Sequence, residues 1–425
     1  EQTMQALGLL PPVPVFFQKG QGALDFSGQQ DDTLSFFGQF DWHLTDQWTL
    51  TGGLIYTQVD KSAFVNQTNT DVFSNLDFVT VGFGAIFFQL TGLPPTPENV
   101  AANPAAAAQA AALARQPCSP ETGPACNPTL ALQPLQFIPP VVDFPNSVEP
   151  GTSDDSKTTW TARVAFQATD NINLYASAAT GFKATSWNLS RDTKPFASDI
   201  PALLQAGLGV PNMTAGTRYA GPEESTSYEL GFKGVWSTAN LYVAVFDQEI
   251  EGFQSNIFTG TGFILANAGK QSTTGIEVDS MWVPNERWRL TFSGTWLDPE
   301  YDDFKEGTGV DGPEDLSGTT PAGIHGLSIV ASATYYFDLF NARSFLRGEF
   351  IYEDDVQLVE NVPKDIASRE VNMLNASWGL AWNNGVEVIL WGRNLTNDEY
   401  LLSAFPAVAQ EGSYSGYPNQ PRTYG

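Results

Sequence analysis

Aromatic residues in the long connections of this 425-residue chain are the side chains best suited to contact a ligand. Their rings are largely apolar, and Trp and Tyr also carry a polar atom, so that together with nearby Asn and Gln they suit a bulky chelate or a sugar-like molecule. The alternative is that the same rings pack the connections against one another. The candidates are Trp187, Phe196, Tyr219, Phe253, Phe258, Phe405, Tyr414 and Tyr417.

Acidic side chains form a second candidate group between residues 298 and 315, at Asp298, Glu300, Asp302, Asp303, Glu306, Asp311, Glu314 and Asp315. Carboxylates at alternate positions suit Ca²⁺, which prefers oxygen ligands. The segment lacks the D-x-[DN]-x-[DN]-G spacing of a calcium loop, however, and acidic loops are usually only solvated. We therefore expect no metal site here, with calcium binding as the open alternative.

The chain has only two histidines, His43 in a predicted turn and His325 at the start of a predicted strand. This pair cannot form a histidine-based zinc site or a catalytic triad, and it does not readily form a pair of haem ligands. Gly252, Gly260 and Gly262 lie outside the strand–helix context that a phosphate-binding loop requires. The sequence thus predicts neither an enzyme nor a bound cofactor.

Composition narrows the class of protein further. The chain has 20 Lys and Arg against 47 Asp and Glu, a formal charge of −27, so it has no basic surface for nucleic acid. Only 16% of the residues are charged and 12% are aromatic, so the chain can form a large apolar surface. Cys118 and Cys126 are closely spaced, which favours a disulfide in an oxidising compartment, a reduced pair being the alternative.

The side chains alternate with a period of two, which predicts the strands that must position these candidates. The clearest case is Trp288, Leu290 and Phe292, which alternate with Arg289 and Thr291. The pattern recurs about 13 times, mostly near the ~9–11 residues that cross a bilayer at a tilt. The predicted strands are residues 34–42, 48–57, 160–166, 174–182, 225–235, 241–248, 264–282, 288–296, 328–337, 344–352, 371–382 and 386–395, with a partial strand from about Gln420.

Short and long connections alternate between these strands. The tight ones include 43–47, 169–171, 237–240, 284–286 and 383–385, and the long ones include 60–156, 184–222, 298–323, 354–368 and 396–417. This alternation is typical of an all-β, antiparallel, up-and-down transmembrane β-barrel with short periplasmic turns and long extracellular loops. Its apolar faces would meet lipid and its polar faces a watery lumen, whereas a soluble β-sandwich would have the reverse orientation.

The low-complexity segment 94–140 contains Pro94-Pro95, an alanine-rich run and both cysteines. The alanine run could form a short helix, but Pro104 is expected to interrupt it early. We interpret the whole segment as a surface loop pinned by the disulfide Cys118–Cys126.

Several segments, in order along the chain, resemble the barrel of the TonB-dependent receptors of the Gram-negative outer membrane. They are FGQFDWHLTDQWTLTGGLIYT (37–57), NLYASAATGFKATSWN (173–188), PEESTSYELGFKGVW (222–236), NAGKQSTTGIEVD (267–279), WLDPEYDDF (296–304), WGRNLTNDEY (391–400) and YPNQPRTYG (417–425). The resemblance runs from about residue 31 to the C-terminus.

The resemblance implies that residues 1–425 are the C-terminal portion of such a barrel, about 13 of roughly 22 strands. On this interpretation 1–30 is a loop remnant, 60–156 is a long extracellular loop, and the first strands and the N-terminal plug domain are absent, so that the chain is expected to be truncated at both ends. Arg393 would then face the lumen toward the plug, but a strand-terminal turn capped by Asn394 and Asn397 is the favoured interpretation.

The implied function is active uptake across the outer membrane of a scarce bulky ligand, usually a ferric siderophore, powered through TonB. The implied partners are outer-membrane lipid and lipopolysaccharide, TonB through the absent N-terminal part, and a small-molecule or metal-chelate ligand. Alternatives are a passive porin-like channel or a surface-binding barrel without import.

Overall fold

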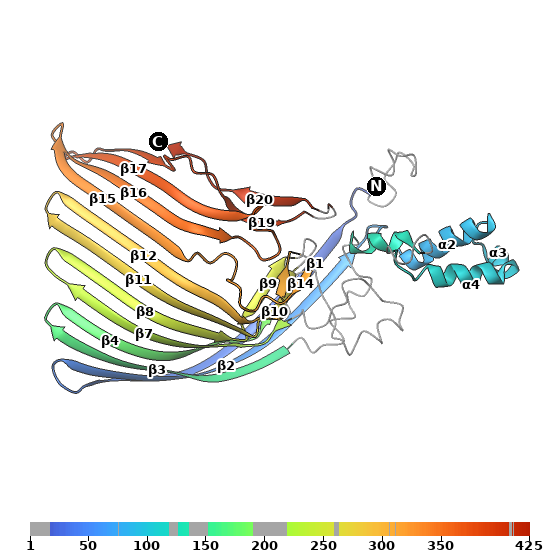
Figure 1. Cartoon of the computed structure of the whole chain (residues 1–425), viewed down its shortest axis with the longest axis horizontal. Coiled ribbons are helices and arrows are strands. Elements are labelled where there is room, and N and C mark those ends of the chain that lie inside the picture. Colours follow the sequence, from blue (N-terminus) through green and yellow to red (C-terminus); the bar gives the residue numbers. More distant parts are fainter. Residues whose placement is uncertain are drawn as a thin grey trace.

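The computed structural model describes residues 18–74, 76–118, 126–135, 152–189, 219–258, 263–305, 307–310, 312–407, 410 and 412–425. Thirteen strands form one antiparallel sheet in which nearly all neighbours in space are also neighbours along the chain (Figure 1). In order across the sheet they are β1 (Ala23–His43), β2 (Trp48–Asn69), β3 (Thr152–Thr169), β4 (Ile172–Lys183), β7 (Glu223–Val235), β8 (Ala239–Glu251), β11 (Lys270–Asn285), β12 (Trp288–Asp303), β15 (Leu327–Leu339), β16 (Ala342–Gln357), β17 (Ser368–Trp382), β18 (Glu387–Arg393) and β21 (Thr423–Tyr424).

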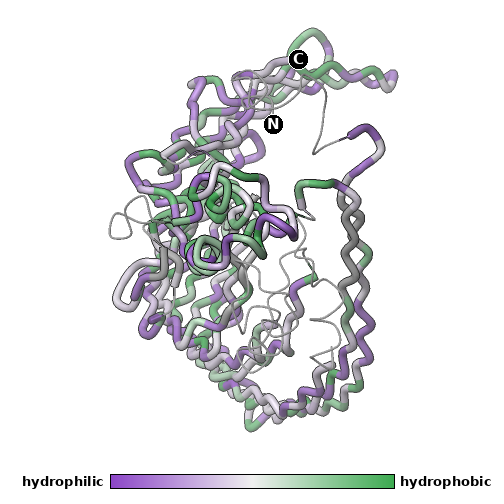
Figure 2. The backbone as a smooth tube through the Cα atoms, turned by 90° about the vertical axis from the view of Figure 1, so that its right-hand side faces the viewer, coloured by the Kyte–Doolittle hydropathy of each residue, from purple (hydrophilic) through white to green (hydrophobic). Residues whose placement is uncertain are grey.

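The strand count and the alternation of connections confirm the predicted fold class. The tight turns gather at one end of the strands, and the long connections gather at the other end (Figure 1). Seen along the strands, the sheet curves around an open interior (Figure 2). It is not closed: within the described residues β1 pairs with β2 alone, in a continuous register from Ala23↔Asn69 to His43↔Thr49.

Several of the predicted boundaries are wrong. β2 continues to Asn69 and β3 begins at Thr152, both inside the segment 60–156 that we expected to be an extracellular loop, because β2 pairs with β1 and with β3 beyond its alternating part. β1 begins at Ala23, inside the segment 1–30 that we expected to be a loop remnant, because pairing with β2 extends it beyond its alternating part; residues 1–17 lie outside the described residues. The predicted strand 264–282 is two strands, β10 (Phe263–Asn267) and β11. The break falls at the buried residue Ala268, whose N–H donates to the carbonyl of Phe253 at 2.6 Å instead of continuing a ladder.

The two faces of the sheet differ in polarity as the alternation predicts. On β1 the side chains of Leu34, Phe36, Phe40 and Trp42 are between 54% and 65% exposed. On the opposite face polar side chains contact one another across strands, as in the hydrogen bond from Thr51 Oγ1 to Asp41 Oδ1 at 2.6 Å. An exposed apolar face beside a polar one is the arrangement that a barrel uses in lipid.

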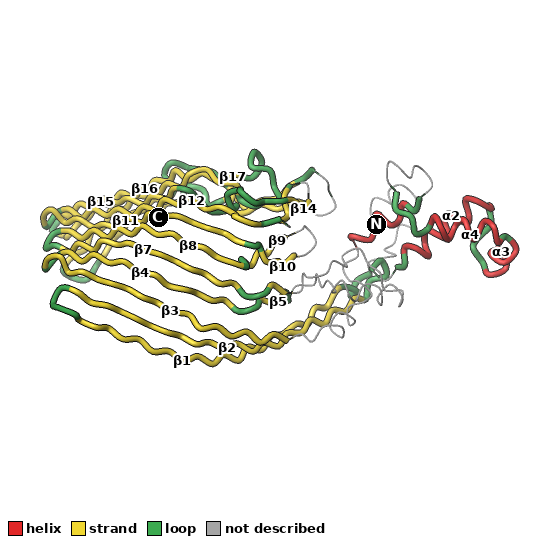
Figure 3. The backbone as a smooth tube through the Cα atoms, turned by 60° about the horizontal axis from the view of Figure 1, so that its bottom comes forward, coloured by secondary structure: helices red, strands yellow, loops and turns green. Residues whose placement is uncertain are grey.

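A helical unit stands between β2 and β3, beyond the ends of the strands (Figures 1 and 3). It consists of α2 (Phe78–Thr91), α3 (Pro97–Ala102), α4 (Pro104–Leu113) and the 3₁₀ helix η1 (Pro128–Leu135). The interpretation of 94–140 as a surface loop with at most a short helix in its alanine run is therefore wrong for its described part, which is mainly helical, and residues 119–125 and 136–140 lie outside that part. Pro104 begins α4 rather than interrupting it, since a proline at the first helical position removes no hydrogen bond.

The helical unit has its own small core and cross-links. Ile86 and Phe87 of α2 pack against Ala110 and Ala114 at the end of α4. Cys118 and Cys126 are joined by a disulfide with their Cα atoms 4.9 Å apart. None of the helices in the described part of the chain combines the length and the hydropathy needed to cross a bilayer.

We expect Asn127→Ala to loosen this unit without unfolding the sheet. The completely buried Asn127 donates from Nδ2 to the carbonyls of Phe78 (2.9 Å) and Ala114 (2.8 Å), and its Oδ1 accepts from the backbone N–H of Thr129 (3.0 Å). Loss of these bonds should cost about 1–3 kcal/mol locally.

The measurement is limited proteolysis of the helical unit, compared with thermal unfolding of the sheet. Glu98→Ala, an exposed change in α3, is the control and should leave cleavage unchanged. Equal cleavage of the Asn127 variant and the parent chain would contradict the prediction.

Candidate functional site

The candidate site lies where the long connections leave the strands, at the end opposite the tight turns. Two of the predicted aromatic residues meet there across a two-residue ladder formed by β5 (Ser186–Trp187) and β6 (Tyr219–Ala220). The ring centroids of Trp187 and Tyr219 are 5.2 Å apart, and Trp187 Nε1 donates to Ser153 Oγ at 3.2 Å. The Trp187 side chain is half-buried and Tyr219 is 36% exposed, so this pair keeps ring surface available for contact.

A second aromatic group lies on the hairpin of β19 (Leu401–Pro406) and β20 (Tyr414–Pro418). Phe405 and Tyr417 have ring centroids 5.9 Å apart, and Tyr417 is 62% exposed. Tyr414 instead packs against a buried cluster formed by Val362, Ala367 and Ala404. The hairpin thus presents one aromatic pair and uses its third ring for packing.

Phe253 joins neither pair, and it is the one remaining aromatic candidate whose side chain the structure describes. Phe253 packs against the buried cluster of Ala268, Tyr301, Phe304 and Leu316, which holds the connection between β12 and β15 against the strand ends. That connection includes the hairpin of β13 (Gly307–Gly309) and β14 (Gly312–Glu314). Phe258 ends β9 (Gln254–Phe258), but its side chain lies outside the described part of the structure, as does all of Phe196.

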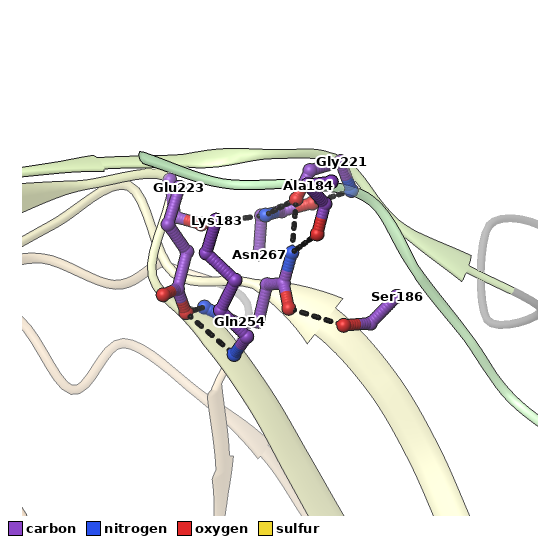
Figure 4. Close-up of polar contacts among 8 residues, drawn as sticks. Lys183, Ala184, Ser186, Gly221, Glu223, Gln254 and Asn267 are labelled. Atoms are coloured by element: carbon purple, nitrogen blue, oxygen red, sulfur yellow. Dashed lines mark hydrogen bonds and ion pairs between the residues drawn. The ribbon is translucent and has the colours of Figure 1, made fainter. Parts of the chain in front are cut away.

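Gln254, which is not among the residues predicted from the sequence, joins the connections at this end through hydrogen bonds (Figure 4). Its Nε2 donates to the carbonyls of Ala184 (3.0 Å) and Gly221 (2.8 Å), and its Oε1 accepts from Ser186 Oγ (2.5 Å). Its backbone N–H donates to Glu223 Oε1 at 2.5 Å. We call this group of contacts the Gln254 clasp. No local motif marks it, because its partners are distant in sequence.

Asn267 and Lys183 extend the clasp on either side (Figure 4). Asn267 Nδ2 donates to the carbonyls of Gly221 (3.0 Å) and Gly252 (2.6 Å), and Asn267 Oδ1 accepts from the N–H of Gly221 (2.7 Å). Lys183 Nζ lies 3.4 Å from Glu223 Oε1. The clasp therefore joins the connection between β4 and β7 to the connection between β8 and β11.

Three acidic residues of the segment 298–315, Asp302, Asp303 and Asp315, have partners other than a metal. Asp302 accepts from Ser272 Oγ (2.9 Å), and Asp303 pairs with Lys305 (3.0 Å), which raises the pKa of the Lys305 ammonium. Hydrogen bonds from Ser317 lower the pKa of Asp315. Within the described residues no three His, Cys, Asp or Glu side chains are grouped as a metal site would require, and Glu306 and Asp311 lie outside them.

The polar face of the last strands carries a recess of about 120 Å³, lined in part by Arg347, Glu349, Asn375, Trp391 and Arg393. Arg347 Nη2 donates to Glu349 Oε2 (2.6 Å), and Asn375 Nδ2 donates to Glu349 Oε1 (3.1 Å). Beyond Arg393 the chain turns, with Asn394 and Asn397 in the left-handed region. The predicted capping turn is therefore present, and Arg393 also lines the recess.

Comparisons with known proteins agree with this architecture. The family model described as "TonB dependent receptor-like, beta-barrel" matches residues 10–395. The pesticin receptor of Yersinia pestis is 24% identical over 162 residues, 37% of this chain and 20% of that protein.

Solved structures match over most of the chain. The ferric yersiniabactin uptake receptor FyuA from Yersinia pestis aligns with a TM-score of 0.60 and 16% identity, over 95% of this chain and 46% of that one. The siderophore receptor PiuA from Acinetobacter baumannii aligns with a TM-score of 0.55 and 15% identity, over 94% and 43%. The chain thus spans less than half the length of these proteins. It belongs to the TonB-dependent receptor-like β-barrels of the outer membrane.

Proposed function

We propose that this chain is the barrel part of an active importer that takes up a scarce, bulky ligand across the outer membrane, with a ferric siderophore as the cargo. TonB would supply the energy through a plug domain, and outer-membrane lipid and lipopolysaccharide would surround the apolar face. The observation that carries the proposal is the arrangement of the sheet: an apolar face for lipid, a polar face around an open interior, and two aromatic pairs in the long connections at one end.

The similar proteins support the choice of cargo. The matched structures include a ferric yersiniabactin uptake receptor and a siderophore receptor. A chelate of this kind is too large and too dilute for efficient passive flux, so tight binding followed by energised release is the suitable mechanism. The aromatic pairs Trp187–Tyr219 and Phe405–Tyr417 are the proposed ligand contacts, since flat amphipathic rings bind such molecules at low entropic cost.

The decisive experiment is uptake of ⁵⁵Fe-labelled chelates by intact cells that carry the whole receptor, with and without TonB. We expect accumulation inside the cell to fall to background without TonB, while binding at the cell surface persists. A passive channel would give unchanged flux in both strains. A surface-binding barrel would give surface binding without accumulation in either strain, and each of these results would reject active import.

A further inference from the structure

We infer that Gln254 is a positioning residue that holds the Trp187–Tyr219 pair as a preformed platform for a flat ring of the ligand. This inference rests on the proposed function. It adds that the Gln254 clasp fixes one of the proposed ligand contacts, and that this contact selects ligands with a flat ring. Gln254 itself does not touch the ligand on this account. It acts through the backbone of the neighbouring connection.

The two aromatic residues need such a device because their own ladder is very short. Among the described residues β5 and β6 pair at Ser186↔Ala220 and Trp187↔Tyr219, in the same register as the β4–β7 ladder, which ends at Lys183↔Glu223. No ladder pair joins the two legs of the connection in the gap between these ladders, at residues 184–185 of the outgoing leg and 221–222 of the returning leg. A two-residue ladder beyond such a gap is weak by itself. The rings approach to 5.2 Å only while the outgoing leg at Trp187 and the returning leg at Tyr219 stay side by side.

The Gln254 amide closes this gap from a different connection. It reaches the outgoing leg at Ala184 and Ser186 and the returning leg at Gly221, so that one side chain bridges both legs. Both amide hydrogens and the amide oxygen are used, and the residue is buried. Because an amide that is fully bonded and buried has a single favourable orientation, the separation of the legs is fixed.

The remaining contacts brace the clasp rather than duplicate it. Glu223 accepts from the N–H of Gln254 and pairs with Lys183. These contacts fix the position of Gln254 relative to the ends of β4 and β7. Gly252, with φ of +67°, lets the chain turn directly after β8, where a Cβ atom would lie 2.8 Å from the carbonyl oxygen of Pro222. The turn therefore brings Gln254 close to the legs that it bridges.

Of the described aromatic candidates, this pair is the one whose spacing depends on the clasp. Phe253 is packed in the cluster of Tyr301 and Phe304, and the Phe405–Tyr417 pair lies on its own hairpin. Stacking of aromatic rings is sensitive to their offset and separation. We therefore expect the clasp to control binding of ligands that carry a flat ring, and to matter much less for ligands without one.

The test uses the full-length receptor in detergent and two iron(III) probes, a tris-catecholate with flat rings and an aliphatic trihydroxamate with none. Affinities are measured by calorimetric titration. Gln254→Ala and Gln254→Glu should each weaken catecholate binding by about tenfold, and hydroxamate binding should change less than about twofold. Gln254→Glu is informative because it keeps an oxygen for Ser186 but loses both donors to Ala184 and Gly221.

Asn127→Ala is the matched control. Asn127 Nδ2 donates to the carbonyls of Phe78 (2.9 Å) and Ala114 (2.8 Å) and so ties the connection between β2 and β3 in a similar way, within a helical unit that contains neither aromatic pair. It should leave the affinity for both probes unchanged. If Asn127→Ala weakened catecholate binding as much as Gln254→Ala, general loosening of the connections would explain the effect and the inference would be wrong.

A disulfide staple separates positioning from direct contact. Ser186→Cys and Ala220→Cys place two cysteines directly opposite each other on β5 and β6, a separation that a disulfide can span. Added to Gln254→Ala, the staple should restore catecholate binding to within about twofold of the parent receptor. Failure of this rescue, with the disulfide formed, would overturn the positioning role.

Different results would reject the proposed function and the positioning role of Gln254. If the parent receptor binds neither probe and ⁵⁵Fe uptake is absent in the TonB-positive strain, the proposed function fails. If the parent receptor binds the catecholate and neither Gln254 variant changes its affinity, the proposed function stands and the inference about the clasp is overturned.

Discussion

Replacing Leu230 with arginine is expected to lower the free energy of unfolding of the lipid-embedded receptor by about 2–4 kcal/mol. Leu230 lies in β7 and is 63% exposed, on the same row of the apolar face as Val245, Ile276 and Trp296. It is six residues before Trp236 at the tight-turn end. At about 3.3 Å per residue and a tilt near 40°, this places it roughly midway through an apolar band of about 25 Å.

The physical reason is the cost of a guanidinium group among acyl chains. A charge at mid-depth loses its hydration, and within the sheet there is no partner on the apolar row to replace it. Nearer the membrane surface the same change should cost much less, because the side chain can reach the headgroups.

Ser227→Arg is the control for Leu230→Arg. Ser227 lies on the other face of β7, with Glu229, whose carboxylate accepts from Tyr175 Oη at 2.5 Å. An arginine there would enter the watery interior and should change the unfolding free energy little. Urea titrations in lipid vesicles compare the two variants. A larger loss at Ser227 than at Leu230 would mean that the apolar row does not face lipid.

Much of the fold was predictable because the pattern that specifies it is local. The alternation of Leu34, Phe36 and Phe40 with Ser35 and Phe37 contains enough information to predict a strand and its two faces. Residues 27–33 have no such alternation, and side chains two apart bond along the strand instead, as Gln30 does to Asp32 at 3.0 Å. Only pairing with β2, which is not visible locally, shows that they continue β1.

The sequence predicts which types of residue form the candidate site, but it does not predict which of them contact one another. Trp187 and Tyr219 were selected as aromatic residues in long connections, but the same criterion selected Phe253 and Tyr414, which pack against buried clusters. Gln254 reaches Ala184 across 70 positions of sequence, and nothing in its neighbourhood distinguishes it from an ordinary surface glutamine. Contacts of this range depend on which strand ends lie side by side, which the local sequence does not specify.

Asn394 shows the opposite case. An asparagine at the end of a predicted strand indicates a capped turn, and its side-chain amide makes hydrogen bonds that matter for stability. The residue follows β18 with φ of +52° and is buried. Its Nδ2 donates to the carbonyls of Asp398 (2.9 Å) and Gln420 (3.1 Å), and its Oδ1 accepts from the N–H of Asp398 (2.7 Å). The sequence suggested a capping asparagine, and the structure adds that the same amide anchors the C-terminal segment through Gln420.

We expect Asn394→Ala to cost about 2–5 kcal/mol of local stability. The change leaves the N–H of Asp398 without its acceptor, at about 1–3 kcal/mol, whereas the carbonyls of Asp398 and Gln420 keep a second donor in Asn419 Nδ2. It also places a Cβ-bearing residue in the left-handed region without the local bonds that asparagine makes, at about 1–2 kcal/mol. The segment 396–425 should therefore loosen at the end of β18, which limited proteolysis and thermal unfolding will both register.

Two further variants separate the contributions of backbone conformation and of hydrogen bonding to the expected loss of stability. Asn394→Gly removes the conformational penalty but not the lost hydrogen bonds, so it should be about 1–2 kcal/mol less damaging than alanine. Asn394→Asp keeps the acceptor for Asp398 N–H but directs a carboxylate at two carbonyl oxygens, so it should be no better than alanine. If the glycine variant were as stable as the parent chain, backbone conformation alone would account for the turn, and the amide would not be what holds the C-terminal segment to the barrel.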